Sequence, residues 1–166
     1  MIFGYNRSRR DIWIQSHLKM IDNDAVLLDV GAGSSPYKEY LSHCKYFAHD
    51  FVQLDNTQIQ DEEGYSKMDF ISDVLNIPVE NSFADAILCT EVIEHVKHPT
   101  LVIKELNRIV KKGGKLFLTA PLISGIHQAP YHFYGGFTKY WYLEILAENG
   151  FEIIELKENG IYSYHS

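Results

Sequence analysis

The chain has 166 residues, and its 15 Lys and Arg against 22 Asp and Glu give a formal net charge of −7. That length predicts a single domain over residues 1–166 with room for a buried core. The acidic balance argues against nucleic-acid and anionic-membrane partners, and no apolar run approaches the roughly 20 residues of a membrane span. Cys44 and Cys89 are too few for a disulfide framework, so we expect a cytoplasmic location.

The first half of the chain alternates strand-like and helical or irregular segments. Ser8 and Asp11 form a capping-box pattern ahead of Ile14, Leu18 and Ile21, which recur at helical spacing and predict a helix. Strands are expected at 25–30, 46–50, 67–72 and 84–90. A short helix to about residue 43 follows the first strand, and a long loop is expected over 53–66.

The second half continues this alternation. Pro99 is expected to begin a helix that runs to Lys112 and ends at Gly113. A strand at 115–120, a helix from Thr138 to Gly150 and a sixth strand at 151–156 follow. Strands separated by helices predict parallel βαβ units. We therefore expect an α/β fold with a doubly wound, Rossmann-like, mostly parallel sheet of about six strands.

A glycine-rich turn follows the first predicted strand. Gly31 and Gly33 come directly after Asp29-Val30, and such glycines let the backbone pass close to a ligand at the carboxyl edge of a sheet. Pro36 stands where a dinucleotide fingerprint has its third glycine, which counts against a nicotinamide-dependent oxidoreductase. Asp29 would also repel a diphosphate, so it suits a cationic ligand better.

Two further carboxylates end predicted strands. Asp50 ends the second strand, where an acid can accept hydrogen bonds from both ribose hydroxyls. Asp73 follows the third strand, where its carboxylate could meet an exocyclic amine while the Val74 N–H donates to a ring nitrogen. Either acid alone could simply cap a turn. Three acids in order along one sheet edge favour a ligand-binding edge over turn caps alone.

Taken together, these motifs resemble the class I S-adenosylmethionine-dependent methyltransferases, in particular the type 11 group. The resemblance runs from about residue 11 to residue 156 and includes residues 73–78, 83–87, 91–96, 106–114 and 150–152, with Pro99 between them. It implies S-adenosylmethionine as the methyl donor. It also implies cofactor contacts for Asp29, Gly31 and Gly33 (methionine part), Asp50 (ribose), Phe51 (adenine face), Asp73 and Val74 (adenine edge), and Thr90 with Glu91.

In this family a basic or tyrosyl group before the first strand commonly holds the methionine carboxylate. Tyr5, Arg9 or Arg10 could serve here.

Candidate general bases for an oxygen or nitrogen nucleophile lie after the fifth predicted strand. His127 and His132 are the candidate catalytic residues, and Tyr131 and Tyr134 are candidate substrate or lid residues. His95 is a candidate substrate contact, or scaffolding at a helix start, because residues 94–96 belong to the family pattern. No acidic or Cys partner lies at ligand spacing from His127 and His132, so no metal is expected.

The sequence therefore predicts methyl transfer from S-adenosylmethionine to an oxygen, nitrogen or carbon nucleophile of a small molecule. The first alternative is a non-catalytic S-adenosylmethionine-binding or scaffolding domain. A nicotinamide-dependent oxidoreductase is a second, less favoured alternative.

The sheet of this family normally contains an antiparallel seventh strand, but only six residues follow Gly160. We therefore expect that strand to be missing. Either the chain is a shortened version or a C-terminally truncated fragment, or its sixth strand pairs directly with the fifth. A partner could also fill the gap, as in a homodimer through the unfinished sheet edge.

Overall fold

The structure is a computed structural model that describes residues 3–55, 58 and 64–158. Parts of the predicted 53–66 loop and residues 161–166 lie outside the described residues, and the side chain of Tyr5 is likewise not described. Among the described residues, no helix is both long and apolar enough to span a bilayer.

Five parallel strands form the sheet, in the order β3-β2-β1-β4-β5. They are β1 (Val26–Val30), β2 (Lys45–Asp50), β3 (Phe70–Ile71), β4 (Ala84–Thr90) and β5 (Val110–Thr119). The chain runs outward from β1 to β3 and then returns to place β4 on the other side of β1. In open α/β sheets such a reversal creates a crevice at the carboxyl ends of the strands, where ligands bind. The predicted doubly wound, Rossmann-like α/β fold is confirmed.

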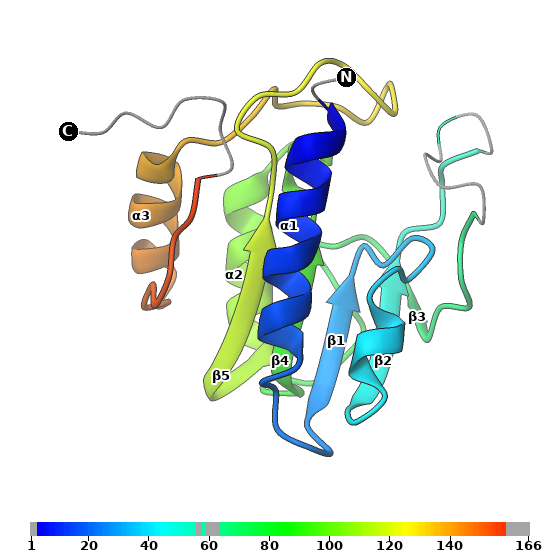
Figure 1. Cartoon of the computed structure of the whole chain (residues 1–166), viewed down its shortest axis with the longest axis vertical. Coiled ribbons are helices and arrows are strands. Elements are labelled where there is room, and N and C mark those ends of the chain that lie inside the picture. Colours follow the sequence, from blue (N-terminus) through cyan, green and yellow to red (C-terminus); the bar gives the residue numbers. More distant parts are fainter. Residues whose placement is uncertain (1–2, 56–57, 59–63, 159–166) are drawn as a thin grey trace.

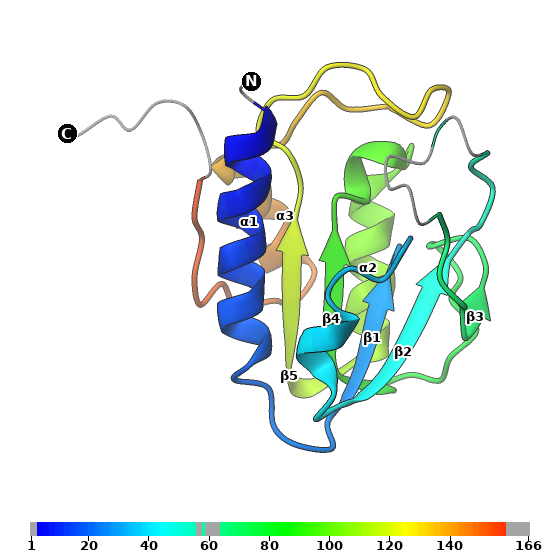
Figure 2. The ribbon, with the colours of Figure 1, turned by 45° about the vertical axis from the view of Figure 1, so that its right-hand side comes forward.

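Helices cover both faces of the sheet (Figures 1 and 2). The helix α1 (Phe3–Leu18) and the short 3-10 helix η1 (Lys38–Leu41) lie on one face, and α2 (Pro99–Ile109) and α3 (Lys139–Glu148) lie on the other. Another 3-10 turn, η2 (Ile93–His95), follows β4.

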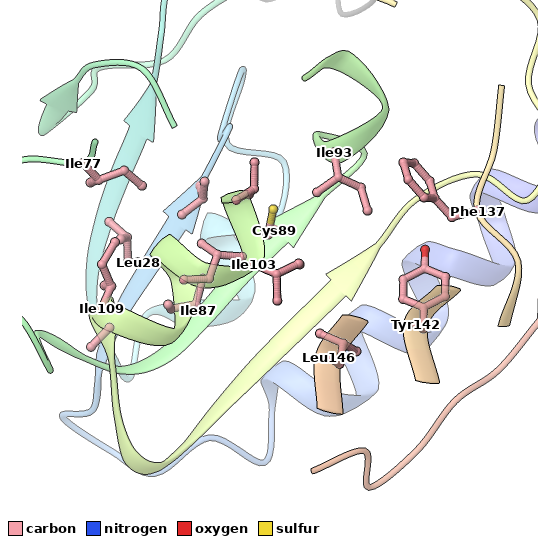
Figure 3. Packing of buried hydrophobic residues seen from close by; sticks show 14 residues of the cluster. Leu28, Ile77, Ile87, Cys89, Ile93, Ile103, Ile109, Phe137, Tyr142 and Leu146 are labelled. Atoms are coloured by element: carbon pink, nitrogen blue, oxygen red, sulfur yellow. The ribbon is translucent and has the colours of Figure 1, made fainter. Parts of the chain in front are cut away.

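The core consists of two layers because successive side chains of a strand point to opposite faces. Leu27 packs with Ile14 and Leu18 of α1, whereas the next residue, Leu28, packs in the cluster that contains α2 and α3. Figure 3 shows this second cluster, with Ile103 of α2 among its buried residues. The sheet is thus fixed from both sides, which holds its carboxyl edge rigid.

The predicted start of the first helix is wrong. The helix α1 begins at Phe3, so Ser8 lies inside the helix and not at its cap. Gly4 lowers helix propensity but does not end a helix, so the helix continues upstream of the capping pattern. The apolar spacing was the better signal, because Ile14 and Leu18 are fully buried, as predicted.

Boundaries around β5 and β3 also differ from the prediction. The helix α2 ends at Ile109, and β5 already begins at Val110, which pairs with Ala84. Lys111 lies in this strand, and its Nζ forms an ion pair with Asp85 Oδ1 at 2.7 Å. A register shift between Ala84 and Ala86 accommodates the extra residues. The third strand, expected over 67–72, is reduced to the two residues of β3.

The sixth strand predicted at 151–156 is wrong. Phe151 and Ile153 turn toward the core while Ile154 is 87% exposed, so the segment has the alternation of a strand. However, it pairs with none of the five strands of the sheet. Side chains attach it to α1 instead, and Glu155 Oε2 lies 2.8 Å from His17 Nε2 (Figure 2). The described residues also contain no antiparallel strand pair.

Candidate functional site

A continuous groove follows the carboxyl ends of the strands and extends along β5 to α1 and residues 150–158. The segment between β5 and α3 passes across the carboxyl ends of the strands (Figure 1). The groove is lined by every cofactor contact that the resemblance implied between β1 and the turn after β4, namely Asp29, Gly31, Gly33, Asp50, Phe51, Asp73, Val74, Thr90 and Glu91. His95, His127 and Tyr131 line it as well. His132 and Tyr134 are not among the described residues that line the groove.

The glycine-rich turn brings backbone close to the turn after β4. Gly31 has a φ of +70° and Gly33 a φ of +54°, a region that glycine adopts without steric cost. A Cβ on Gly31 would lie 2.4 Å from Val92 Cγ2, whereas a Cβ on Gly33 would meet nothing within 4 Å. Gly31 is therefore required by both conformation and space, and Gly33 by conformation alone.

Asp29 is buried at the end of β1. Its Oδ2 accepts a hydrogen bond of 2.6 Å from the Tyr46 hydroxyl, and only 2% of the residue is exposed. Burial raises the pKa of the Asp29 carboxyl to about 7, because water no longer stabilises its charge. Asp29 thus connects β1 to β2 in addition to bordering the groove.

Asp50 and Asp73 do cap turns, as the simpler interpretation of the sequence held. Asp50 accepts hydrogen bonds from the N–H groups of Gly33 (3.0 Å) and Val52 (3.1 Å), and Asp73 Oδ1 accepts one from Leu75 N–H (2.8 Å). These bonds fix the carboxylates at the groove, and each oxygen has a second lone pair. Capping a turn and contacting a ligand are therefore compatible roles for these residues.

Arg9 and Arg10, two candidates for the methionine carboxylate, both line the groove, and Arg10 contacts the residue after β4. Arg10 Nη1 lies 3.3 Å from Glu91 Oε2, directly after β4. Glu91 has a φ of +54°, and its Oε1 accepts a hydrogen bond of 3.0 Å from Thr119 Oγ1. A non-glycine residue in this conformation costs about 1–3 kcal/mol and is typical of functional sites.

His95, His127 and His132 lie together, although the chain separates the first from the other two by more than 30 positions. The ring centroid of His95 is 4.7 Å from that of His127 and 5.6 Å from that of His132. Burial is the main reason that the pKa of His95 falls to about 4, so this ring is neutral near pH 7.

The two candidate lid tyrosines have different positions. The ring of Tyr131 contacts Phe51 edge to face, with 5.4 Å between the centroids, and so covers the predicted adenine position. Tyr134 instead donates its hydroxyl to the backbone carbonyl of Lys97 at 2.8 Å. Tyr131 therefore fits a lid, while Tyr134 attaches the loop to the turn after β4.

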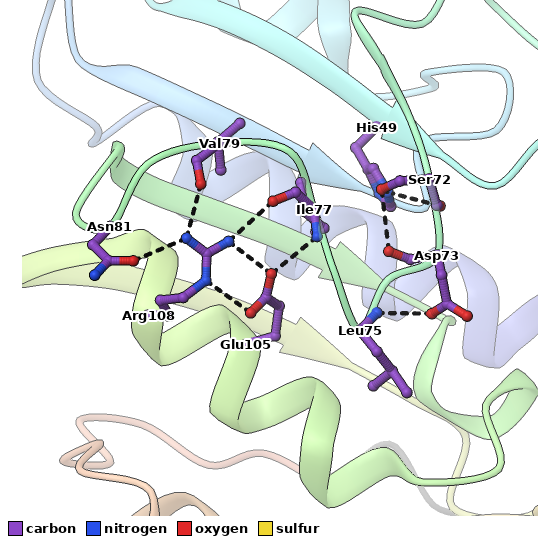
Figure 4. A network of polar contacts seen from close by, with 9 residues as sticks. All are labelled: His49, Ser72, Asp73, Leu75, Ile77, Val79, Asn81, Glu105 and Arg108. Atoms are coloured by element: carbon purple, nitrogen blue, oxygen red, sulfur yellow. Dashed lines mark hydrogen bonds and ion pairs between the residues drawn. The ribbon is translucent and has the colours of Figure 1, made fainter.

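The sequence interpretation gave no role to Arg108, which fixes the segment after Asp73 (Figure 4). Arg108 donates to both carboxylate oxygens of Glu105 and to the carbonyls of Ile77 and Val79. The Glu105–Arg108 spacing on a helix is a known ion-pair signal. This spacing could have indicated the ion pair between Glu105 and Arg108, but not the hydrogen bonds from Arg108 to the carbonyls of Ile77 and Val79.

The groove fits a nucleoside-like cofactor with a charged end. It offers carboxylates for ribose and amine groups, the half-buried ring of Phe51, and a glycine turn that a Cβ would close. The turn leads into the four-residue η1, not into a long helix, so it lacks the strong helix dipole that binds a pyrophosphate. Fold and groove together define a Rossmann-like protein with a nucleoside-type cofactor site.

Comparison with known proteins identifies the family. Residues 28–118 match the family described as a methyltransferase domain. The chain belongs to this family, the class I S-adenosylmethionine-dependent methyltransferases, as the sequence motifs predicted. S-adenosylmethionine is the methyl donor of this family.

Individual relatives agree with this assignment. A ubiquinone biosynthesis O-methyltransferase of Xanthomonas oryzae pv. oryzae is 30% identical over 103 residues, which cover 57% of this chain and 42% of the relative. The chain thus spans less than half the length of this curated relative.

Two solved structures share the fold. A Bacillus halodurans C-125 protein provisionally called a methyltransferase has a TM-score of 0.68 and 19% identity, covering 87% of this chain and 70% of that one. The [4+2]-cyclase SpnF has a TM-score of 0.63 and 22% identity, covering 90% and 58%.

Proposed function

We propose that this protein binds S-adenosylmethionine in the groove and transfers its methyl group to an oxygen, nitrogen or carbon nucleophile of a small molecule. The observation that carries the proposal is the placement of Asp29, Asp50 and Asp73 at the carboxyl ends of neighbouring strands, beside Gly31 and Gly33. This edge is where the fold binds nucleosides. When bound, the cofactor supplies an already activated methyl group.

The residues of the chain would contribute mainly position. Asp50 and Asp73 are already held by backbone N–H groups, so little ordering remains for them when a ligand binds. Tyr131, which contacts Phe51 in the free chain, would exclude water from the adenine side after adenine displaces it from Phe51. Positioning in a dry site accounts for much of the rate of such a transfer.

Oxygen is the favoured acceptor atom within this proposal. The curated relative acts as an O-methyltransferase, and a hydroxyl acceptor needs its proton removed. His95 and His127 carry imidazole rings on the same groove, so they could accept that proton. The proposed function therefore places the acceptor on their side of the groove.

Asp73→Asn is the sharpest variant for the cofactor site. Asn keeps one carbonyl oxygen for the Leu75 N–H, but it replaces the other oxygen by a donor, which cannot accept from an exocyclic amine. We expect the fold to persist and the affinity for S-adenosylhomocysteine, measured by titration calorimetry, to fall about tenfold. Asp69→Asn is the matched control, because Asp69 caps Ala48 N–H outside the groove. Equal affinity in both variants would contradict the adenine-edge role.

Turnover needs a separate measurement. Incubation with S-adenosylmethionine and pools of small hydroxyl, amine and activated-carbon compounds should release S-adenosylhomocysteine with at least one pool. Failure of any binding at millimolar S-adenosylhomocysteine would refute the cofactor assignment itself.

A non-catalytic or differently catalytic cofactor-binding protein is the second candidate. SpnF, which shares the fold, is a cyclase, so the fold alone does not require methyl transfer. Binding of S-adenosylhomocysteine without release in any acceptor pool would favour this candidate. The oxidoreductase alternative is less favoured, because Pro36 and the short η1 make a poor pyrophosphate site.

One edge of the sheet could support the homodimer that the sequence predicts. β5 is the terminal strand of the described sheet, so its outer edge has no strand neighbour there. A second copy could add its own β5 at this edge. Sedimentation equilibrium would distinguish a dimer from a monomer.

A further inference from the structure

His95 and His127, which line the groove, form a compact set of nitrogen donors with the neighbouring His132. His95 ends η2, while His127 and His132 lie in the segment between β5 and α3. One ring nitrogen from each lies within 4.8 Å of the others. The centroids of His127 and His132 are 4.5 Å apart. Two distant parts of the chain thus bring three imidazoles to one point.

Existing hydrogen bonds leave suitable lone pairs on two of these rings. His95 Nδ1 faces the carbonyl of Tyr131, and His127 Nδ1 lies 2.9 Å from the carbonyl of Gly125. A ring nitrogen that faces a carbonyl must donate, so in the neutral ring Nε2 carries the lone pair. Metal-binding histidines show this arrangement, with one nitrogen fixed by a carbonyl and the other free to ligate.

The third ring carries an unpaired nitrogen. His132 Nδ1 is buried and has no hydrogen-bond partner among the described residues. Buried polar atoms are nearly always paired, so this ring nitrogen is available to a hydrogen-bond donor, an acceptor or a metal ion.

The backbone fixes the cluster independently of any ion. The carbonyl of Glu94 accepts hydrogen bonds from Phe133 N–H (2.9 Å) and Tyr134 N–H (3.2 Å). These bonds directly follow His132 in the chain and connect its loop to the residue before His95. Backbone bonds thus hold the loop of His132 beside His95 without a metal ion.

A buried carboxyl group beside the cluster also suits a cation. Glu94 is fully buried, and neither of its oxygens has a hydrogen-bond partner in the described structure. Its Oε1 lies 3.6 Å from His95 Nε2, the atom that would bind the ion. A carboxylate at this position would compensate part of the charge of a divalent ion.

We propose that His95, His127 and His132 form a binding site for a divalent transition-metal ion of the Zn²⁺ type. Three imidazoles without other donors favour such ions over Mg²⁺ or Ca²⁺, which take oxygen ligands. Tetrahedral Zn²⁺ requires nitrogens about 3.3 Å apart, so the rings must close in from their present spacing.

A metal at this position would change the role of the histidines. With three protein ligands, a four-coordinate ion keeps one position for water or an acceptor oxygen. The histidines would then act as ligands and not as bases. This use of the open position rests on the proposed function, whereas metal binding itself does not. The sequence alone predicts no metal, because the ligand spacing includes His127 and His132 but not the distant His95.

The test uses the untagged full chain after treatment with a chelator. Titration calorimetry with ZnCl₂ should give one ion per chain, and Co²⁺ should produce the visible absorption of a tetrahedral site. His127→Ala and His132→Ala should each weaken Zn²⁺ binding at least about tenfold. His98→Ala is the matched control, because this exposed histidine near His95 lies outside the cluster. Circular dichroism checks that each variant is folded.

Two outcomes would overturn the metal site. One is no stoichiometric Zn²⁺ binding by the folded wild-type chain, and the other is binding that the double variant His127→Ala/His132→Ala retains. Titration with S-adenosylhomocysteine in the absence of metal tests the proposed cofactor site separately. The two proposals can therefore fail independently.

Discussion

Two glycines of one turn make a matched pair for measuring what the cofactor loop demands. Gly31 and Gly33 have φ values of +70° and +54°, so alanine would be strained at either position. A left-handed conformation costs a residue with a Cβ about 1–2 kcal/mol. Only at Gly31 would the new Cβ also collide, at 2.4 Å from Val92 Cγ2. Overpacking of this kind adds about 1–3 kcal/mol.

We therefore expect Gly33→Ala to lower the free energy of unfolding by about 1–2 kcal/mol and Gly31→Ala by about 2–5 kcal/mol. Urea unfolding followed by circular dichroism measures both. Val92→Ala removes the colliding methyl, so the double variant Gly31→Ala/Val92→Ala should recover at least about 1 kcal/mol relative to the sum of the single changes.

The control for this reasoning is the difference between the two positions. Equal destabilisation by Gly31→Ala and Gly33→Ala would refute the proposed collision. Strict additivity of Gly31→Ala and Val92→Ala would refute it as well, because two residues that do not touch contribute independently.

Three further predictions concern burial, a polar network and a loop. The pKa of Asp29 in the folded chain, about 7, exceeds its ordinary value of 3.8, so stability should fall as pH rises between these values. Asp29→Asn should remove that fall and be more stable than wild type at pH 8 by up to about 4 kcal/mol in urea unfolding; an unchanged pH profile would contradict this. Arg108→Lys should cost about 2 kcal/mol in the same assay, since lysine cannot reproduce the planar set of bonds, and wild-type stability would show that the network contributes nothing. Gly136→Ala should destabilise by more than about 3 kcal/mol, because its Cβ would lie 1.9 Å from the carbonyl oxygen of Leu122, while Gly125→Ala, with open space, serves as the control.

The placement of the cofactor residues could be predicted from the sequence because it follows from strand direction. Asp29, Asp50 and Asp73 each end or follow a parallel strand, and parallel strands end at one edge. No long-range loop geometry enters this inference. The same holds for Gly31, whose position after the strand already implies a turn.

The histidine cluster could not be predicted because it depends on how a long loop folds back. His95 meets His127 and His132 where the carbonyl of Glu94 accepts hydrogen bonds from the backbone of residues 133 and 134. No periodicity in the sequence encodes such a contact. The failed sixth strand has a related cause. Phe151 and Ile153 pack toward the core while Glu152 and Ile154 are exposed, but such alternation specifies a face and not a hydrogen-bonding neighbour.

The segment between β5 and α3 is the element that joins the two halves of the site. Tyr131 contacts Phe51 on the cofactor side, and its carbonyl faces His95 on the acceptor side. An adenine ring that displaces Tyr131 from Phe51 would therefore also shift the hydrogen bond that fixes the tautomer of His95. Cofactor binding and the donor set of the histidines are then coupled through one residue, and coupling between two sites is reciprocal. Zn²⁺ should accordingly change the affinity for S-adenosylhomocysteine in the wild-type chain, and Tyr131→Ala should reduce that change.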